Sequence, residues 1–248
     1  PGLLIHRHAD PCYVPHVIND DHETALLNVR GVTKSFAGVQ ALRGVDLEVL
    51  AGEVHCVLGQ NGAGKSTLIK VLAGVHRPDS GDIAWQGEPT EIPDPESAIH
   101  LGIATMYQEL DVVDGLTIAE NIFLGHEISR GGFSRRSEAA AQTRALLDRL
   151  GHGNLSPHTE VGQLSAANKQ IVQMARALSH DIRLIIMDEP SAVLDSEEVR
   201  NLFAVVRGLT AQGIAVIYIT HRLEEIRQIG DRITVLKDGR STASGLAV

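Results

Sequence analysis

The segment GQNGAGKST, which begins at Gly59, carries the residue types and the spacing that hold phosphate groups. It fits the pattern G-x-x-x-x-G-K-[ST] and lies between an apolar run and a helix-forming run, the context that this pattern requires. Gly59, Gly62 and Gly64 let backbone N–H groups approach phosphate oxygens at the positive end of the following helix. Lys65 is placed to neutralise β and γ phosphates, and the Ser66 hydroxyl is placed to ligate Mg²⁺. A chance glycine turn is the alternative, but it gives no reason for a lysine followed by a hydroxyl.

Two adjacent carboxylates end the apolar segment LIIMDEP at residues 184–190. Asp188, at the strand end, can bind the Mg²⁺ shell, and Glu189 can hold an attacking water as general base. The alternative is an ordinary solvated strand end. That alternative weakens because the phosphate motif independently requires such an acid.

The elements that must position these groups alternate as in an α/β protein. Continuous apolar runs at 183–187 and 214–220 are typical of strands buried in a parallel sheet, and a helix at 197–209 separates them. The Asp238-Gly239 pair predicts a final hairpin. The other predicted elements are strands at 27–29, 45–49, 54–58, 82–86, 102–107 and 232–236, helices at 68–72 and 135–150 (the latter after Ser134), and a helix with Ile171, Met174, Ala175 and Leu178 on one face.

Composition indicates a globular protein and argues against several classes. The chain has 248 residues, 43% of them hydrophobic, and a formal net charge of −9, so its surface repels a phosphate backbone and no nucleic-acid partner is expected. No apolar run approaches the ~20 residues that cross a bilayer, and no secretory signal is recognisable. Cys12 and Cys56 are too few for a disulfide framework, which fits a cytoplasmic compartment.

Residues 1–24 show no hydrophobic periodicity and are expected to form a flexible leader before a single domain at 25–248. The chain starts with proline rather than methionine, which suggests trimming. Four histidines in the leader suggest a metal site, but no acidic or cysteine ligands accompany them at regular spacing. They are His6, His8, His16 and His22.

Residues from about 25 to 240 resemble one complete ATPase domain of the ATP-binding-cassette (ABC) family. The segment LSAANKQIVQMARALS resembles the family signature, in which Ser165 caps a helix and the segment grips ATP bound to a second cassette. Gln108 in MYQEL matches the glutamine loop, and His221 after YIT matches the switch histidine. Asp195 in SAVLD matches the aspartate loop that follows the second acid. Phe36 in TKSF falls where the family stacks an aromatic ring on adenine, with core packing as the alternative.

The resemblance implies a fold and a set of site residues. The fold is α/β: a P-loop NTPase (RecA-like) core with a mixed, mainly parallel sheet, an antiparallel β subdomain, and an α-helical subdomain inserted at about 109–165. The implied catalytic residues are Glu189, His221, Lys65 and Gln108, and the implied Mg²⁺ ligands are Ser66, Gln108 and Asp188. The implied ATP contacts are Phe36, Gly59, Gln60, Asn61, Gly62, Ala63, Gly64, Lys65, Ser66 and Thr67. The signature residues facing a partner's ATP are Leu164, Ser165, Ala166, Ala167 and Asn168.

The signature departs from the family pattern LSGGQ. Ala166, Ala167 and Asn168 replace two glycines and a glutamine, which affects how closely the backbone can approach the partner's nucleotide. Ser165 is retained, and backbone donors could still serve.

Within the family, the stretches GVTKSFAGVQALRGVDLEV and GLTIAENIFLGHE and the altered signature resemble the first cassette of bacterial sugar importers of the ribose, xylose and galactoside type. In those importers two cassettes are fused in one longer chain on the cytoplasmic side of a permease. The resemblance implies a second cassette, transmembrane permease subunits and, indirectly, a solute-binding protein as partners, and a peripheral location on the cytoplasmic face of the bacterial inner membrane. We expect this chain to be the N-terminal half of such a protein or a single-module relative. A helical segment at 116–127 is the candidate surface facing the permease.

The expected reaction is hydrolysis of ATP by in-line attack of water, without a covalent intermediate. In fused relatives the second cassette often lacks the catalytic carboxylate, so Glu189 predicts that this site is the hydrolytic one. One alternative is an ATP-gated binding module with little hydrolysis, which the altered signature would allow. Another alternative is a soluble ABC ATPase acting on DNA or ribosomes. The net charge of −9 and the short segment between Gln108 and Ser165 argue against it. The identity of the sugar stays open.

Overall fold

A computed structural model describes residues 25–109, 111–130 and 133–248, and the predicted leader with its histidines and Cys12 lies outside the described residues. Within that part of the chain, six strands form a sheet in the order β12-β11-β3-β10-β9-β6. Neighbours from β11 to β6 run parallel, and β12 pairs antiparallel with β11. These strands are β3 (Val54–Gly59), β6 (Ile103–Met106), β9 (Leu184–Asp188), β10 (Ala215–Thr220), β11 (Arg232–Lys237) and β12 (Arg240–Ala247).

Both faces of this sheet are buried, which explains its continuous apolar runs. In β10, Val216 and Tyr218 belong to one core cluster, whereas Ala215, Ile217 and Ile219 belong to the other. Successive side chains of a strand point to opposite faces, so a strand covered on both sides is apolar at nearly every position.

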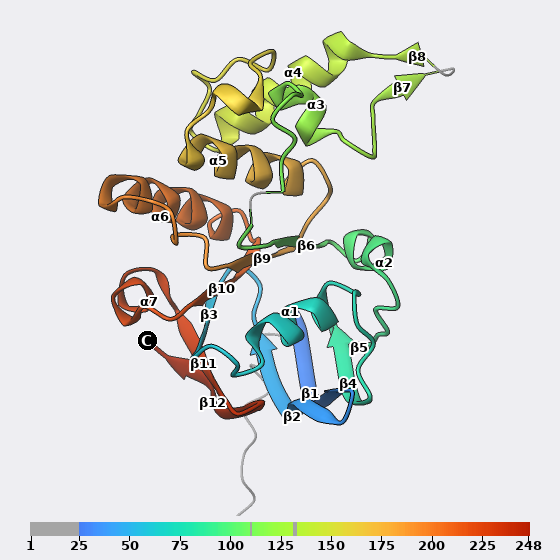
Figure 1. Ribbon diagram of the computed structural model, residues 1–248, viewed down its shortest axis with the longest axis vertical. Helices are drawn as coiled ribbons and strands as arrows, with labels where there is room; N and C mark the ends of the chain where they lie inside the picture. The colour runs from blue at the N-terminus through green and yellow to red at the C-terminus, as the bar shows by residue number, and fades with distance from the viewer. Residues whose placement is uncertain (1–24, 110, 131–132) are drawn as a thin grey trace, which may run out of the picture.

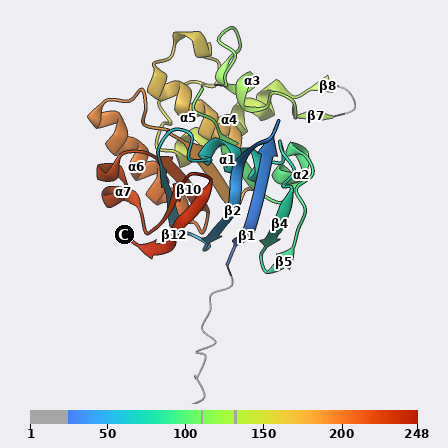
Figure 2. The same ribbon diagram turned by 60° about the horizontal axis from the view of Figure 1, so that its bottom comes forward.

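An antiparallel sheet closes one of the two cores. It has the order β2-β1-β4-β5, and helix α1 (Lys65–Leu72) contributes Leu68, Ile69 and Leu72 to the same cluster. Figure 2 turns this sheet toward the viewer, with β1, β2 and β4 side by side. The strands are β1 (Leu27–Phe36), β2 (Val39–Val49), β4 (Ser80–Trp85) and β5 (Glu88–Pro89).

Helices pack against the other face of the large sheet to close the second core, and they form one end of the molecule. Figure 1 shows α3 (Ile118–Ile122), α4 (Arg136–Arg149) and α5 (Ala166–Ala177) gathered at the end opposite the antiparallel sheet. Apolar side chains of α6 (Ser196–Thr210) and α7 (Leu223–Ile229) pack in the same cluster as Val216 and Tyr218. The remaining elements are α2 (Pro95–His100), the hairpin β7 (Ser129–Arg130) and β8 (Phe133–Ser134), and the 3₁₀ turn η1 (Val161–Gln163).

The expected combination of a mainly parallel sheet, an antiparallel sheet and a helical layer is confirmed, but two helix predictions are wrong in extent. The segment 116–127 is not one helix, because α3 ends at Ile122 and Gly125 adopts a φ of 87°. The helix predicted from residue 68 begins at Lys65. The helix predicted at 135–150 is present as α4, but its N-cap is Arg135 rather than Ser134 and makes no side-chain capping bond.

Candidate nucleotide-binding site

The glycine-rich turn joins β3 to α1 in a conformation that glycine adopts readily. Gly64 is the N-cap of α1 with a φ of 106°, and a Cβ there would lie 2.9 Å from Cδ2 of Leu42 and 3.0 Å from the carbonyl oxygen of Ala41. Gly62 has a φ of 81°, and a Cβ added there would meet no described atom within 4 Å. Glycine is therefore favoured at this position by the backbone conformation and not by lack of space. The first turn of α1 contains no acidic residue, so its positive end can attract an anion.

Lys65 is held in the turn itself and is 7% exposed. Its Nζ donates to the carbonyl oxygens of Gly59 at 2.7 Å and Gln60 at 3.3 Å. It also lies 4.0 Å from Oε1 of Glu189. A phosphate in the turn would draw this ammonium from its carbonyl partners, because hydrogen bonds between charged groups are stronger.

The two acids at the end of β9 have different surroundings. Asp188 is half-buried, and burial raises the pKa of its carboxyl group, with the charge of Glu189 adding to the rise and Lys65 opposing it. Glu189 has a φ of 46°, which is uncommon for a residue with a Cβ, and its N–H donates to the carbonyl oxygen of Ile219 at 2.9 Å. Its Oε1 lies 3.1 Å from Nδ1 of His221. The turn after β9 therefore brings the acid and the histidine together from two strands.

Apart from His221, which is outside the described lining, these groups line one pocket of about 760 Å³, a volume typical of small-molecule sites. Of the predicted residues, the lining includes Gln60, Asn61, Gly62, Gly64, Lys65, Ser66, Thr67, Gln108, Asp188 and Glu189. One wall was indicated by none of the motifs, and it comes from β2 and the β11–β12 turn: Val39, Gln40, Ala41, Arg43, Asp238 and Gly239.

Gly239 joins this wall to the phosphate turn through backbone hydrogen bonds. Its N–H donates to the carbonyl oxygen of Ala63 at 3.0 Å, and its carbonyl accepts from the N–H of Arg43 at 2.7 Å. A Cβ on Gly239 would lie 2.6 Å from the carbonyl oxygen of Ala41. The Asp238-Gly239 pair predicted the hairpin correctly, but it carried no signal for this tertiary position.

The pocket also offers a donor set that fits Mg²⁺. Ser66, Gln108 and Asp188 supply hydroxyl, amide and carboxylate oxygens, and all three line the pocket. Magnesium prefers such oxygen donors together with phosphate oxygens and water. Among the described residues, no group of three or more His, Cys, Asp or Glu could hold a metal.

Phe36 lies at the end of β1 and is outside the described lining of the pocket. It is 40% exposed, so it is not a core side chain. Its ring meets the ring of His76 edge-on at 4.9 Å between centroids, and Nζ of Lys34 lies 5.6 Å from its centroid.

The described lining of the pocket includes no residue of the signature segment or of the aspartate loop. Ser165 is the N-cap of α5, and its Oγ accepts from the N–H of Asn168 at 3.3 Å, as expected. The side-chain amide of Gln170, one turn later, donates to the carbonyl oxygen of Pro190. This bond joins α5 to the loop that carries Glu189, and no motif predicted it.

Asp195 caps α6. Its Oδ1 accepts from the N–H groups of Glu197 at 2.8 Å and Glu198 at 2.9 Å, and Glu198 Oε2 accepts in return from the N–H of Asp195 at 3.0 Å. Such a capping box stabilises a helix start.

Known proteins share this sequence pattern. The profile of the family described as "ABC transporter" matches residues 42–192. The Ribose import ATP-binding protein RbsA 1 of Rubrobacter xylanophilus is 51% identical over 215 residues, covering 87% of this chain and 43% of the relative. The Putative ribose/galactose/methyl galactoside import ATP-binding protein 2 of Burkholderia cenocepacia is 45% identical over 235 residues, covering 92% of this chain and 44% of the relative. The chain thus spans less than half the length of these curated relatives.

Solved structures share the fold. The ADP conformation of MJ1267, an ATP-binding cassette of an ABC transporter, has a TM-score of 0.80 at 28% identity, covering 88% of this chain and 90% of that one. A dimeric post-hydrolysis state of the cassette MJ0796, bound to ADP and Pi, has a TM-score of 0.75 at 25% identity, covering 88% and 97%. No helix in the described part of this chain is long and apolar enough to cross a membrane.

Proposed function

The chain belongs to the ABC transporter family, and we propose that it is the ATP-binding and ATP-hydrolysing cassette of a sugar importer. The proposal is supported most directly by Lys65, Glu189 and His221, which meet beside the glycine-rich turn. Oε1 of Glu189 lies 3.1 Å from Nδ1 of His221 and 4.0 Å from Nζ of Lys65.

Each group has a part in the proposed hydrolysis. The turn and Lys65 bind the phosphates, Glu189 accepts a proton from the attacking water, and the water oxygen bonds to the γ-phosphorus as the bond to the β-phosphate oxygen breaks. His221 contacts the γ-phosphate. Mg²⁺, held by Ser66, Gln108 and Asp188, would neutralise phosphate charge when bound. Phe36 is proposed to stack on the adenine.

A second cassette completes the proposed site. The segment from Leu164 to Asn168 would contact ATP bound to the partner, and a partner's segment would contact ATP bound here. Exposure of Ser165 and Ala166 at the start of α5 is compatible with this contact. The dimeric cassette MJ0796, found with ADP and Pi, supports a paired arrangement.

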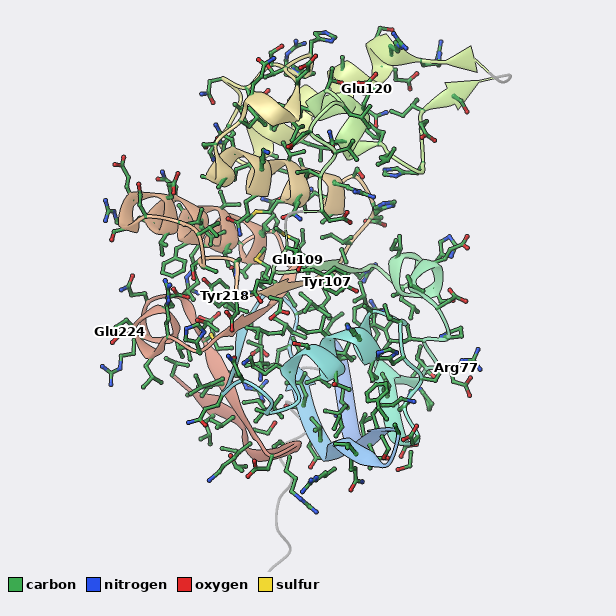
Figure 3. The ribbon with its side chains drawn as sticks, viewed as in Figure 1. Arg77, Tyr107, Glu109, Glu120, Tyr218 and Glu224 are labelled. Atoms are coloured by element: carbon green, nitrogen blue, oxygen red, sulfur yellow. The ribbon has the colours of Figure 1, made fainter. Side chains whose placement is uncertain are left out.

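Sugar import is supported by the names of the relatives, which refer to ribose and galactose import. We propose that permease subunits dock beside Gln108, with a solute-binding protein acting indirectly, on the cytoplasmic face of the inner membrane. An apolar groove of about 300 Å³ between α2, β6 and α5 offers a surface there; its lining includes Ile99, Met106 and Tyr107. Figure 3 shows Tyr107 and Glu109 at the junction of the sheet and the helical layer. The segment 116–127, the candidate from the sequence, adjoins α5 through α3.

An ATP-gated binding module is the second candidate, because Ala166 and Ala167 replace the signature glycines. Mg²⁺-ATP binding and turnover of this chain distinguish the two, measured alone and with a second cassette added. We expect Glu189→Gln to retain binding and lose at least about 100-fold in turnover. Glu197→Gln, which changes an exposed acid on α6, is the matched control and should retain turnover. Binding without turnover under every condition would favour the binding module.

A further inference from the structure

We propose that Glu225 is a positioning residue for hydrolysis, because its buried carboxylate ties the loop that carries Glu189 to the loop that carries His221. The proposal rests on the proposed function, since it concerns the geometry of the same reaction.

Glu225 receives four hydrogen bonds in a buried position. It is 6% exposed. Its Oε1 accepts from Oγ of Ser191 at 2.6 Å and from a guanidinium nitrogen of Arg222 at 3.2 Å. Its Oε2 accepts from the hydroxyl of Tyr218 at 3.1 Å and from Oγ1 of Thr220 at 3.0 Å. A buried carboxylate is tolerated only with such a set of partners.

The two oxygens serve different parts of the site. Ser191 lies two residues after Glu189, and Arg222 directly follows His221, so Oε1 joins the two loops to each other. Tyr218 and Thr220 belong to β10, so Oε2 anchors this junction to the sheet. Glu225 itself touches neither Glu189 nor His221 in any recorded bond among the described residues, which makes it a positioning group.

Helix electrostatics alone do not explain this arrangement. Glu224 occupies the same first turn of α7, where an acid favours the helix, but it is exposed. In Figure 3, Tyr218 lies close to the strands, whereas Glu224 lies at the outer edge of α7. Burial raises the pKa of Tyr218, and Glu225 adds to the rise, so this hydroxyl keeps its proton and stays a donor. Only Glu225 turns its carboxylate inward to these donors.

The proposal distinguishes glutamine from an apolar replacement at position 225. A glutamine oxygen can still accept from Ser191 and Arg222, while its NH₂ group can donate to the hydroxyls of Tyr218 and Thr220, which also accept. Methionine has similar length but provides no comparable acceptor. Glu225→Gln therefore preserves the link between the loops, and Glu225→Met removes it.

The test compares turnover with nucleotide affinity. We expect Glu225→Met to lower kcat by about 30- to 100-fold, because small misplacements of catalytic groups have effects of this size, while the Kd for Mg²⁺-ATP changes less than about threefold. Glu225→Gln should restore kcat to within about fivefold of the original chain. Glu224→Gln is the matched control and should leave both values unchanged. Thermal unfolding shows whether Glu225→Met has folded. If it has not, Ser191→Ala takes its place in the test, because it removes one of the two loop bonds. We expect Ser191→Ala to lower kcat by about fivefold.

A second readout does not depend on turnover. The ring ¹⁵N signals of His221, assigned by their loss in His221→Gln, should shift in Glu225→Met (or in Ser191→Ala, where that variant replaces it) and stay in place in Glu224→Gln. If the original chain has no turnover either alone or with a second cassette added, the proposed function fails, and these signals still decide whether Glu225 positions His221. The positioning role is overturned by unchanged kcat or unchanged His221 signals in the Glu225→Met or substitute variant. It is also overturned by a Glu225→Gln variant as inactive as Glu225→Met.

Discussion

Nδ1 of His221 lies 3.1 Å from Oε1 of Glu189, although the two residues follow different strands of the parallel sheet. An ionised carboxylate only accepts hydrogen bonds, so Nδ1 carries the proton in this contact. In a neutral ring Nε2 is then an acceptor. The ring could donate from Nε2 to a phosphate only as an imidazolium, or after exchanging its Nδ1 proton.

Two amide substitutions separate the roles of these ring nitrogens. His221→Asn places a donor near the position of Nδ1, and His221→Gln places one near Nε2. If the ring acts on the phosphate, His221→Gln should keep about tenfold more turnover than His221→Asn, because a lost charge-assisted bond costs about 1.5–3 kcal/mol. Steady-state ATPase assays measure this, with His158→Gln, an exposed histidine, as control. Higher turnover in His221→Asn would show that the contact with Glu189 is the important one.

Lys65→Met should weaken ATP binding by at least about 100-fold, because phosphate charge would then lie in the turn without its cation. Titration with a fluorescent ATP analogue measures the affinity. Lys70→Met removes an exposed lysine from the same helix and should leave the affinity within about twofold. Equal losses in both variants would point to general electrostatic attraction instead.

Asp188→Asn should raise the unfolding temperature by a few degrees at pH 7 to 8 while removing Mg²⁺-dependent turnover. Burial raises the pKa of Asp188 in the folded chain, so ionisation costs stability at pH values above the ordinary aspartate range. As pH falls through the raised pKa, Asp188 takes up a proton, and the difference from the asparagine variant should shrink. Thermal unfolding across pH 4 to 8 checks this.

The matched control for that comparison is Asp181→Asn, since Asp181 is exposed. Its unfolding temperature should follow that of the unchanged chain. A destabilised Asp188→Asn variant at pH 8 would show that the charge of Asp188 stabilises the fold.

Gly64→Ala and Gly208→Ala should have opposite effects. Alanine at Gly64 would be forced into a φ of 106° and into contact with Leu42 and Ala41. We therefore expect the free energy of unfolding to fall by about 1–3 kcal/mol and ATP binding to be lost. Gly208 lies in α6 with no described atom within 4 Å of its added Cβ, so alanine should gain about 0.5–1 kcal/mol. Denaturant unfolding measures both, and a neutral Gly64→Ala would remove the steric explanation for this glycine.

Local sequence patterns predicted the phosphate turn and the acids because each lies at the end of a strongly apolar strand. The family resemblance placed Lys65, Glu189 and His221 in one site, and the structure brings them together because parallel strands end at one edge of a sheet. Glu225 could not be recognised in this way. Its neighbour Glu224 is the same residue type in the same helical turn, and only the position of α7 against β10 makes one buried and the other exposed.

The wall formed by β2 and the Asp238-Gly239 turn was missed for a related reason. Its contacts join residues far apart in the chain, as in the bond from the N–H of Gly239 to the carbonyl of Ala63. The length of α3 was overestimated because Gly125, with its φ of 87°, follows the end of the helix. Apolar periodicity does not report such backbone conformations.

The order of strands in the large sheet has a consequence for folding. β10 lies between β3 and β9, so the nucleotide pocket cannot form before a strand from the last part of the chain has inserted between two earlier ones. Such non-local pairing is slow, because a long loop must close before its contacts form. Nucleotide would bind only chains that have completed this step. Its binding free energy would therefore stabilise the finished sheet, and intermediates that lack β10 would receive none of this stabilisation.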